Sequence, residues 1–130
     1  MTSSVEGRAK SDTVAIVQAD ADGTIRLWSA GAQMLLGYSA AQAVGQKLDL
    51  LVPDKYREDH WKGFGAAMKR GSLNGDEPFV LPIRCADGQA KHFAGRLMML
   101  LDAYGNSAGA LAIFVPEKPL EGEQQLFRLD

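Results

Sequence analysis

Two histidines, one cysteine and several neighbouring carboxylates are the side chains of this 130-residue sequence that could do chemistry. His60 falls in a stretch with helical spacing, and a neutral imidazole on a helix can hydrogen-bond a ligand or bind a metal ion. His92 falls in an expected strand, and no serine or cysteine is spaced to form a catalytic pair with it. Glu58 and Asp59 are adjacent on a helix, so their carboxylates diverge and cannot flank one substrate. Because the sequence also lacks zinc-protease, redox-thiol, P-loop and serine-hydrolase motifs, we predict that the chain is not an enzyme.

Cys85 is the single cysteine, so no intramolecular disulfide can form. It ends a run of alternating apolar and polar residues that starts at Val80, and its expected role is packing. Arg84 precedes it but would point to the opposite face of a strand, so no neighbour marks the thiol as reactive. A redox or covalent-ligand role is the alternative.

The composition is typical of one globular domain. The formal net charge is −2, 46% of the residues are hydrophobic and 23% are charged. A chain of this length can bury a core without disulfides or a structural metal. Basic residues between Lys55 and Arg70 are interrupted by acidic ones, which indicates a solvated helix face, with a polyanion contact as the alternative. We therefore predict no nucleic-acid partner.

Nothing in the sequence resembles a segment for export or membrane insertion. Residues 1–12 are polar and lack the apolar core of a secretory signal, and no window approaches a membrane span. We predict a cytoplasmic protein without a membrane partner.

Short elements separated by turn residues fill the first half of the sequence. Strands are expected at Val14–Val17 and Thr24–Trp28, joined as a β-hairpin through Asp20–Gly23. Helices are expected at 30–36 and 39–44, each opened by a serine cap and followed or closed by a glycine.

The best helix of the sequence is expected from Lys55 to Arg70. Asp54 is its expected N-cap, and Gly71 is expected to end it. Spacing by fours places a group of side chains on one stripe of this helix, namely Tyr56, His60, Phe64 and Met68. His60 is therefore expected to face inward.

Three further strands are expected, at Phe79–Cys85, Lys91–Leu101 and Ala108–Val115, which would form an antiparallel meander. Pro82 within the first of them indicates an edge strand or a bulge. Met98 and Met99 would lie on opposite faces of the second strand. With the two earlier strands this predicts an α+β fold, in which helices cover one face of an antiparallel sheet.

The order of these pieces resembles the PAS family. The segments that carry the resemblance are DADGTIRLWSAGAQMLLGYSAAQAVGQ, LVPDKYREDHWKGF and RCADG. The resemblance implies a five-stranded antiparallel sheet with short helices and one longer helix over one face, and a cavity between the sheet and the long helix. It covers roughly residues 13–116, which we expect to form the domain, between a flexible leader at 1–12 and a flexible tail at 117–130.

The cavity that the resemblance implies would be lined by residues from several elements. The expected lining residues are Ile16, Leu36, Leu50, His60, Phe64, Met68, Ile83, Leu97 and Ile113. In the alternative interpretation most of these side chains are ordinary core.

The segment Pro53–His60 is similar to the run that carries the iron ligand in haem-binding PAS oxygen sensors. The resemblance implies haem b as a cofactor, with His60 as the metal ligand. Where those sensors place a polar or ligating side chain on the next strand, this sequence has Pro78, Phe79 or Val80, so a structural His60 is the alternative. Leu48–Lys55 contains no cysteine, which argues against a photoreceptor that forms a flavin–thiol bond.

Membership of this family implies a sensory module. We expect it to bind a small ligand or cofactor and to signal in trans to a partner such as a histidine kinase or a transcriptional regulator, as a homodimer. The alternative is a ligand-free PAS module for dimerisation or docking. Whether the chain acts alone or belongs to a longer protein stays open.

Overall fold

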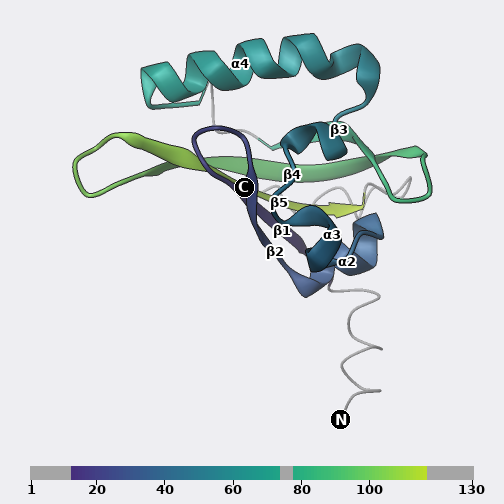
Figure 1. Ribbon diagram of the computed structural model, residues 1–130. Coiled ribbons are helices and arrows are strands. Elements are labelled where there is room, and N and C mark those ends of the chain that lie inside the picture. Colours follow the sequence, from purple (N-terminus) through teal and green to yellow (C-terminus); the bar gives the residue numbers. More distant parts are fainter. Residues whose placement is uncertain (1–12, 74–77, 117–130) are drawn as a thin grey trace.

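An antiparallel sheet of five strands supports helices that cover one of its faces (Figure 1). The computed structural model describes residues 13–73 and 78–116. The strands are β1 (Ala15–Ala19), β2 (Ile25–Trp28), β3 (Phe79–Arg84), β4 (Ala90–Leu101) and β5 (Ser107–Pro116). The helices are α2 (Ala30–Leu36), α3 (Ala40–Ala43) and α4 (Arg57–Arg70), with 3₁₀ turns η1 (Leu48–Leu50) and η2 (Asp54–Tyr56). The predicted α+β architecture is confirmed.

The strands follow the order β2-β1-β5-β4-β3, and all neighbours are antiparallel. The last three strands form the predicted meander, and the first hairpin joins it through β1 and β5. Pro82 lies in β3, which is an edge strand, as its missing N–H requires. Within the described residues, none of the helices has the length and apolar character needed to cross a bilayer.

The turn between β1 and β2 is organised by one aspartate. Asp20 Oδ1 accepts hydrogen bonds from the backbone N–H groups of Asp22, at 2.9 Å, and Thr24, at 3.1 Å. Its other carboxylate oxygen accepts from the Arg26 side chain at 2.9 Å. The hydrogen bond from Arg26, followed by that from Thr24, lowers the pKa of Asp20. The turn is closed by Gly23 with a positive φ of 79°.

The serine caps predicted for the two short helices are present. Ser29 Oγ accepts from the N–H of Ala32 at 3.0 Å and also from Ile16 N–H at 2.9 Å, which ties α2 to β1. Ser39 and Gln42 form a reciprocal capping box at the start of α3. These bonds satisfy backbone donors that a helix start leaves without partners.

The predicted N-cap of the long helix is wrong. Asp54 belongs to η2, and α4 begins at Arg57 after Tyr56, whose side chain makes no capping hydrogen bond. The Asp54 carboxylate instead lies 3.1 Å from the guanidinium of Arg57 and 3.4 Å from that of Arg84. Two cations therefore compete with the helix N-terminus for this carboxylate. The predicted end of the helix at Gly71, with φ of 80°, is confirmed.

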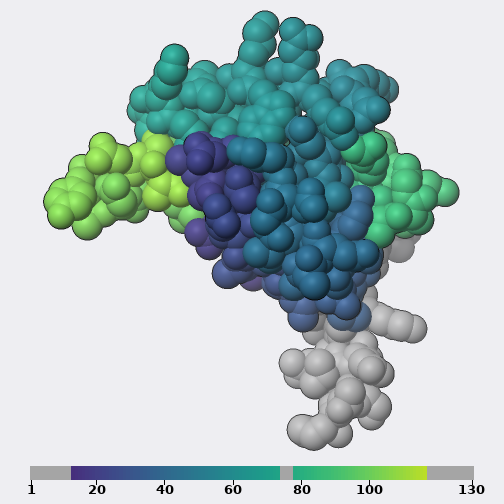
Figure 2. All heavy atoms as spheres, viewed as in Figure 1, coloured from purple at the N-terminus to yellow at the C-terminus, as the bar shows by residue number. Residues whose placement is uncertain are grey.

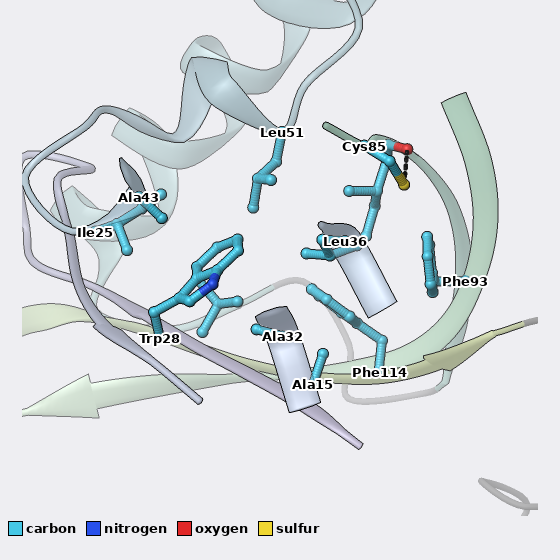
Figure 3. Close-up of a cluster of buried hydrophobic side chains, with 12 residues drawn as sticks. Ala15, Ile25, Trp28, Ala32, Leu36, Ala43, Leu51, Cys85, Phe93 and Phe114 are labelled. Carbon is cyan, nitrogen blue, oxygen red and sulfur yellow. Dashed lines mark hydrogen bonds between the residues drawn. The ribbon is translucent and has the colours of Figure 1, made fainter. Parts of the chain in front are cut away.

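The main hydrophobic core lies between the sheet, α2 and η1 (Figure 3). Trp28 is buried at its centre and donates its indole N–H to the carbonyl of Tyr38 at 2.9 Å. Phe93 and Phe114 close the sheet side with their ring centroids 5.9 Å apart. Among the described residues, no side chain of α4 belongs to this core cluster. The helix α4 thus packs on a separate part of the molecule (Figure 1).

Helix α4 contacts the β1–β2 turn through Trp61. A Cβ added at Gly23 would overlap the Trp61 ring and would come within 3.7 Å of Phe64. Gly23 is therefore required twice, for its positive φ and for the space that the indole occupies.

We predict that Gly23→Ala destabilises the domain by at least about 2 kcal/mol, because positive-φ strain adds to overpacking against Trp61. Gly88→Ala is the matched control, since Gly88 also has a positive φ of 88° but no atom lies within 4 Å of an added Cβ. Urea unfolding of both variants measures the difference. Equal losses of stability would show that the indole does not constrain the turn.

Candidate functional site

The imidazole of His60 is half-buried on α4 and contacts two aromatic rings. Its centroid lies 4.8 Å from that of Trp61 and 5.9 Å from that of Phe64. The Nδ1 atom of His60 is buried, and none of the described residues gives it a hydrogen-bond partner. An unsatisfied buried polar atom costs roughly 1–3 kcal/mol, so this position is unfavourable unless something else engages the imidazole.

The surroundings of His60 favour the neutral imidazole. Desolvation by burial lowers the pKa of His60, and the negative charge of Asp49 opposes this shift only in part. A neutral imidazole offers one donor and one acceptor to a ligand.

Trp61 fixes the neighbouring turn of α4. Its indole N–H donates to Asp49 Oδ1 at 2.6 Å, while its ring packs against Gly23. Its centroid is also 5.5 Å from that of Phe64, in an edge-to-face arrangement. One side chain thus joins α4 to η1 and to the β1–β2 turn.

The backbone carbonyl of Asp49 receives two guanidinium groups. The Arg57 side chain donates to it at 3.2 Å, and the Arg84 side chain donates at 3.3 Å. Arg57 also donates to the carbonyl of Val52 at 3.3 Å. This polar clasp holds the start of α4 against η1 and the end of β3.

A hydrogen bond joins the other end of α4 to the sheet. The hydroxyl of Ser107, the first residue of β5, donates to the carbonyl of Met68 at 2.6 Å. Ala67 is the fully buried residue of this helix. The last turns of α4 therefore rest on β5 through small groups.

The sheet face that α4 covers is apolar and partly exposed. Strand pairing places Leu97 opposite Ala112 and Met99 opposite Ala110, on the face that carries the buried Val17. Leu97 remains 39% exposed although it lies on this face. Because the β5 residues opposite are alanines, little side-chain volume fills the space beside Leu97 and Met99.

We define the candidate site by side chains of α4 and by the residues of β4 on the sheet face that carries Val17. It comprises His60, Phe64 and Met68 from α4, and Leu97 and Met99 from β4. Four of these five were expected from the sequence. Met99 is not among the expected lining residues, and only the alternation of its strand indicates which face it lies on.

The other expected lining residues divide into two groups. Leu36 and Ile83 are buried in the main core, against which Leu50 is packed. Ile16 lies between buried Ala15 and Val17 in β1, so it points to the opposite face of the sheet, and its strand partner Ile113 lies on that face too. The expectation that these two isoleucines line the cavity is corrected by this register.

The sequence analysis missed the anchoring role of Trp61 and Asp49. The available signal was the position of a tryptophan directly after His60, beside a glycine turn that could accept a ring. That signal could not be used, because the contact joins segments far apart in the sequence.

The remaining reactive side chains lie away from the candidate site. Cys85 is buried in the main core, with its Sγ 3.7 Å from the carbonyl of Ile83 (Figure 3). Burial raises the pKa of the Cys85 thiol, which agrees with the expected packing role. His92 pairs with Pro82 and is exposed on the outer face of the sheet. The described residues contain no group of three or more His, Cys, Asp or Glu arranged to hold a metal ion.

The arrangement defines a small α+β domain whose candidate binding region lies between one helix and the sheet. Residues 10–114 match the family described as PAS fold, and the chain therefore belongs to the PAS family. No curated protein matches the chain.

Solved structures with the same fold agree with this assignment. A PAS domain of a protein from Colwellia psychrerythraea is 25% identical over 87% of this chain and 96% of that chain, with a TM-score of 0.69. The PAS domain of the Cronobacter turicensis RpfR quorum-sensing receptor, in complex with C12:0, is 13% identical over 82% of this chain and 95% of its own, with a TM-score of 0.65. A light-oxygen-voltage domain, from a study of a flavin analogue, is 22% identical over 96% of this chain and 91% of its own, with a TM-score of 0.63.

We predict that His60 makes the ligand-free domain less stable in mild acid. Its pKa in the folded state lies below the ordinary 6.5, so the unfolded chain binds the proton more readily. The stability contributed by the neutral imidazole is complete above 6.5 and is lost as the pH falls through that value toward the folded-state pKa. His60→Gln should flatten the dependence of unfolding free energy on pH between about 7.5 and about 5.5.

The matched control is His92→Gln on the exposed outer face, which should keep the slope of the parent domain. Urea unfolding at several pH values measures both variants. Equal slopes for the parent and His60→Gln would remove His60 as the source of this dependence.

Proposed function

We propose that this PAS domain is a sensory module that binds a small, largely apolar molecule carrying one polar group, in the candidate site. Two observations carry the proposal: the buried Nδ1 of His60 has no hydrogen-bond partner among the described residues, and the apolar face of β4 is partly exposed. A polar group on the ligand would satisfy the imidazole, and its apolar part would cover Leu97 and Met99. Both effects favour binding, since each removes an unfavourable feature of the free protein.

Ligands of similar proteins support the chemical class. The RpfR PAS domain of Cronobacter turicensis is in complex with C12:0, an acid with a long apolar chain. A similar structure, a PAS-B domain of Drosophila melanogaster Cycle, contains ethylene glycol. The low identity of both proteins to this chain limits the analogy to the kind of ligand.

Haem b is the second candidate ligand. The observation in its favour is that His60, the residue matched to the iron ligand by the sequence resemblance, is half-buried on α4 beside an apolar surface. A histidine bound to iron almost always donates its second ring N–H to an acceptor, and the described residues offer none to Nδ1. A histidine is a suitable iron ligand, but the surroundings of His60 do not provide the acceptor that its second nitrogen would need. We therefore consider an apolar acid or alcohol a better candidate ligand than haem.

A flavin that reacts with a thiol fits less well. Cys85 lies in the core beneath α2, and the residues of η1 and η2 include no cysteine. Non-covalent flavin binding is therefore the form of this cofactor that a binding assay should include.

We predict that dodecanoate raises the melting temperature of the domain and binds with a measurable Kd. His60→Ala should weaken this binding roughly two- to tenfold, as expected for loss of one hydrogen bond. His92→Ala is the matched control and should bind as the parent does. Titration of the purified, delipidated domain with dodecanoate, flavin mononucleotide and hemin compares the three ligand classes.

The outcomes separate the candidates. A Soret band that survives gel filtration and is lost in His60→Ala would replace the apolar acid by haem. Binding of dodecanoate that is unchanged in His60→Ala would contradict the role given to the imidazole. Failure of all three probes would favour the alternative, a ligand-free interaction module.

We also propose that the domain forms a homodimer through the outer face of its sheet, and signals in trans to a partner such as a histidine kinase or transcriptional regulator in the cytoplasm. The outer face is apolar where a solvated strand would alternate with polar residues. Val80 and Met98 on this face are 49% and 44% exposed. Ile16 and Ile113 lie beside them through the pairing of β1, β5 and β4. Such a patch fits a protein partner, in this proposal a second copy.

We predict that Met98→Glu shifts the domain from dimer to monomer, because it would bury an unpaired carboxylate in the interface. Tyr104→Glu is the control, since Tyr104 is 89% exposed at the tip of the β4–β5 hairpin and lies off the face. Sedimentation velocity over a range of concentrations measures the association. A parent domain that is monomeric at high concentration would overturn the homodimer.

A further inference from the structure

Helix α4 contains two interior glycines that its packing does not require. A Cβ added at Gly63 or at Gly65 would meet no atom within 4 Å. Neither residue has a positive φ, so neither supplies a conformation that alanine would refuse. Glycine in a helix interior is less favourable than alanine, because it loses more backbone freedom on folding. The sequence therefore weakens the middle of this helix without a steric reason.

The two glycines lie between the attachments of α4. Trp61 is fixed by Asp49 and Gly23 on one side, and Met68 is held by the hydroxyl of Ser107 on the other. Between them, Ala67 is buried and Phe64 is half-buried, while Lys62 to Ala66 are otherwise exposed. The segment Lys62–Ala66 thus lies between two attached residues, and most of its own side chains are exposed.

The N-terminal part of α4 is a poor route to the candidate site. At the start of α4, the Arg57 and Arg84 side chains close the space against η1. At Trp61 the indole leaves no room beside Gly23. Figure 2 shows the helix in contact with the first hairpin along this side of the molecule.

Closure also leaves the imidazole of His60 in an unfavourable state. Its Nδ1 is shielded from water and unpartnered while the helix is intact. Local opening of the helix would let water or a ligand hydrogen-bond this atom. The free-energy difference between the closed and the open helix is therefore smaller than it would be if Nδ1 had a partner in the closed form.

From these observations we infer that Lys62–Ala66 is the gate of the candidate site. This segment opens by local unfolding or bending at Gly63 and Gly65, between fixed ends, and admits a small apolar molecule to His60 and Leu97. The identity of the molecule that enters rests on the proposed function, whereas the opening of the helix is a property of the ligand-free chain. It assigns a role to two glycines that neither the core nor the candidate site uses.

The first test measures opening without any ligand. Hydrogen exchange by mass spectrometry should show that α4 peptides exchange faster than peptides from β4 and β5 in the parent domain. Gly63→Ala together with Gly65→Ala should slow exchange in α4 by about five- to thirtyfold, with little change in the sheet. Ala66→Gly, an exposed position in the same segment, is the opposite control and should speed exchange by about two- to fivefold.

Two results would overturn the gate. One is exchange of α4 and the sheet at the same rate, which would place α4 in the same cooperative unit as the core. The other is no response of α4 exchange to the glycine or alanine substitutions. The double alanine variant removes no contact, so failure to fold does not confuse this test.

The second test uses anilinonaphthalenesulfonate as a fluorescent apolar probe in stopped-flow mixing. The double alanine variant should slow both binding and release of the probe by a similar factor, with little change in Kd, because alanine favours the closed helix in the free and bound states alike. Unchanged rates beside slowed exchange would show that ligands do not pass through this segment. Absence of probe binding to the parent would count against the proposed function, whereas the exchange result would still decide whether the helix opens.

Discussion

The position of α4 depends on one contact, the packing of Trp61 against the glycine of the first turn. The indole is placed by its hydrogen bond to Asp49, and the absence of a side chain at Gly23 lets it approach the turn backbone. This contact joins the first hairpin, the η1 turn and the long helix, which are separate in the sequence. Without it, α4 would be held to the sheet mainly by Ser107 and by the arginines at its start.

The large buried side chains are distributed unevenly between the main core and the region under α4. The core beneath α2 contains Trp28, Leu36 and the pair Phe93 and Phe114, all buried. Under α4 the sheet presents alanines and a half-exposed Leu97, and the helix carries two glycines. Regions with few buried apolar contacts open more readily than the core of the same protein. We therefore expect the sheet to be more stable than α4, because the large buried side chains lie in the main core and few of them lie under α4.

Much of the fold could be predicted because its signals are local. The serine caps of α2 and α3 and the edge position of Pro82 each follow from chemistry within a few residues. It is harder to predict which face of the sheet the side chains of β1 and β5 lie on, because a one-residue change of register moves every side chain of a strand to the other face. The expectation that Ile16 and Ile113 line the cavity is wrong for this reason. The alternation of buried Ala15 and Val17 decides the face, and small alanines give little sign of burial in a sequence. Asp54 was misassigned because its partner Arg84 is distant in the sequence.

Coupling between the candidate site and the rest of the domain is constrained by the same contact at Trp61. A ligand can shift a protein between two states only by binding one of them more favourably. Trp61 directly follows His60. A ligand that favours a different orientation of this turn of α4 must therefore also favour a different position of the indole against Gly23 and Asp49. The Asp49 carboxylate receives the indole, while its carbonyl receives Arg57 and Arg84. A different orientation of this turn would therefore disturb the first hairpin directly, at Gly23, and the end of β3 through Asp49 and Arg84.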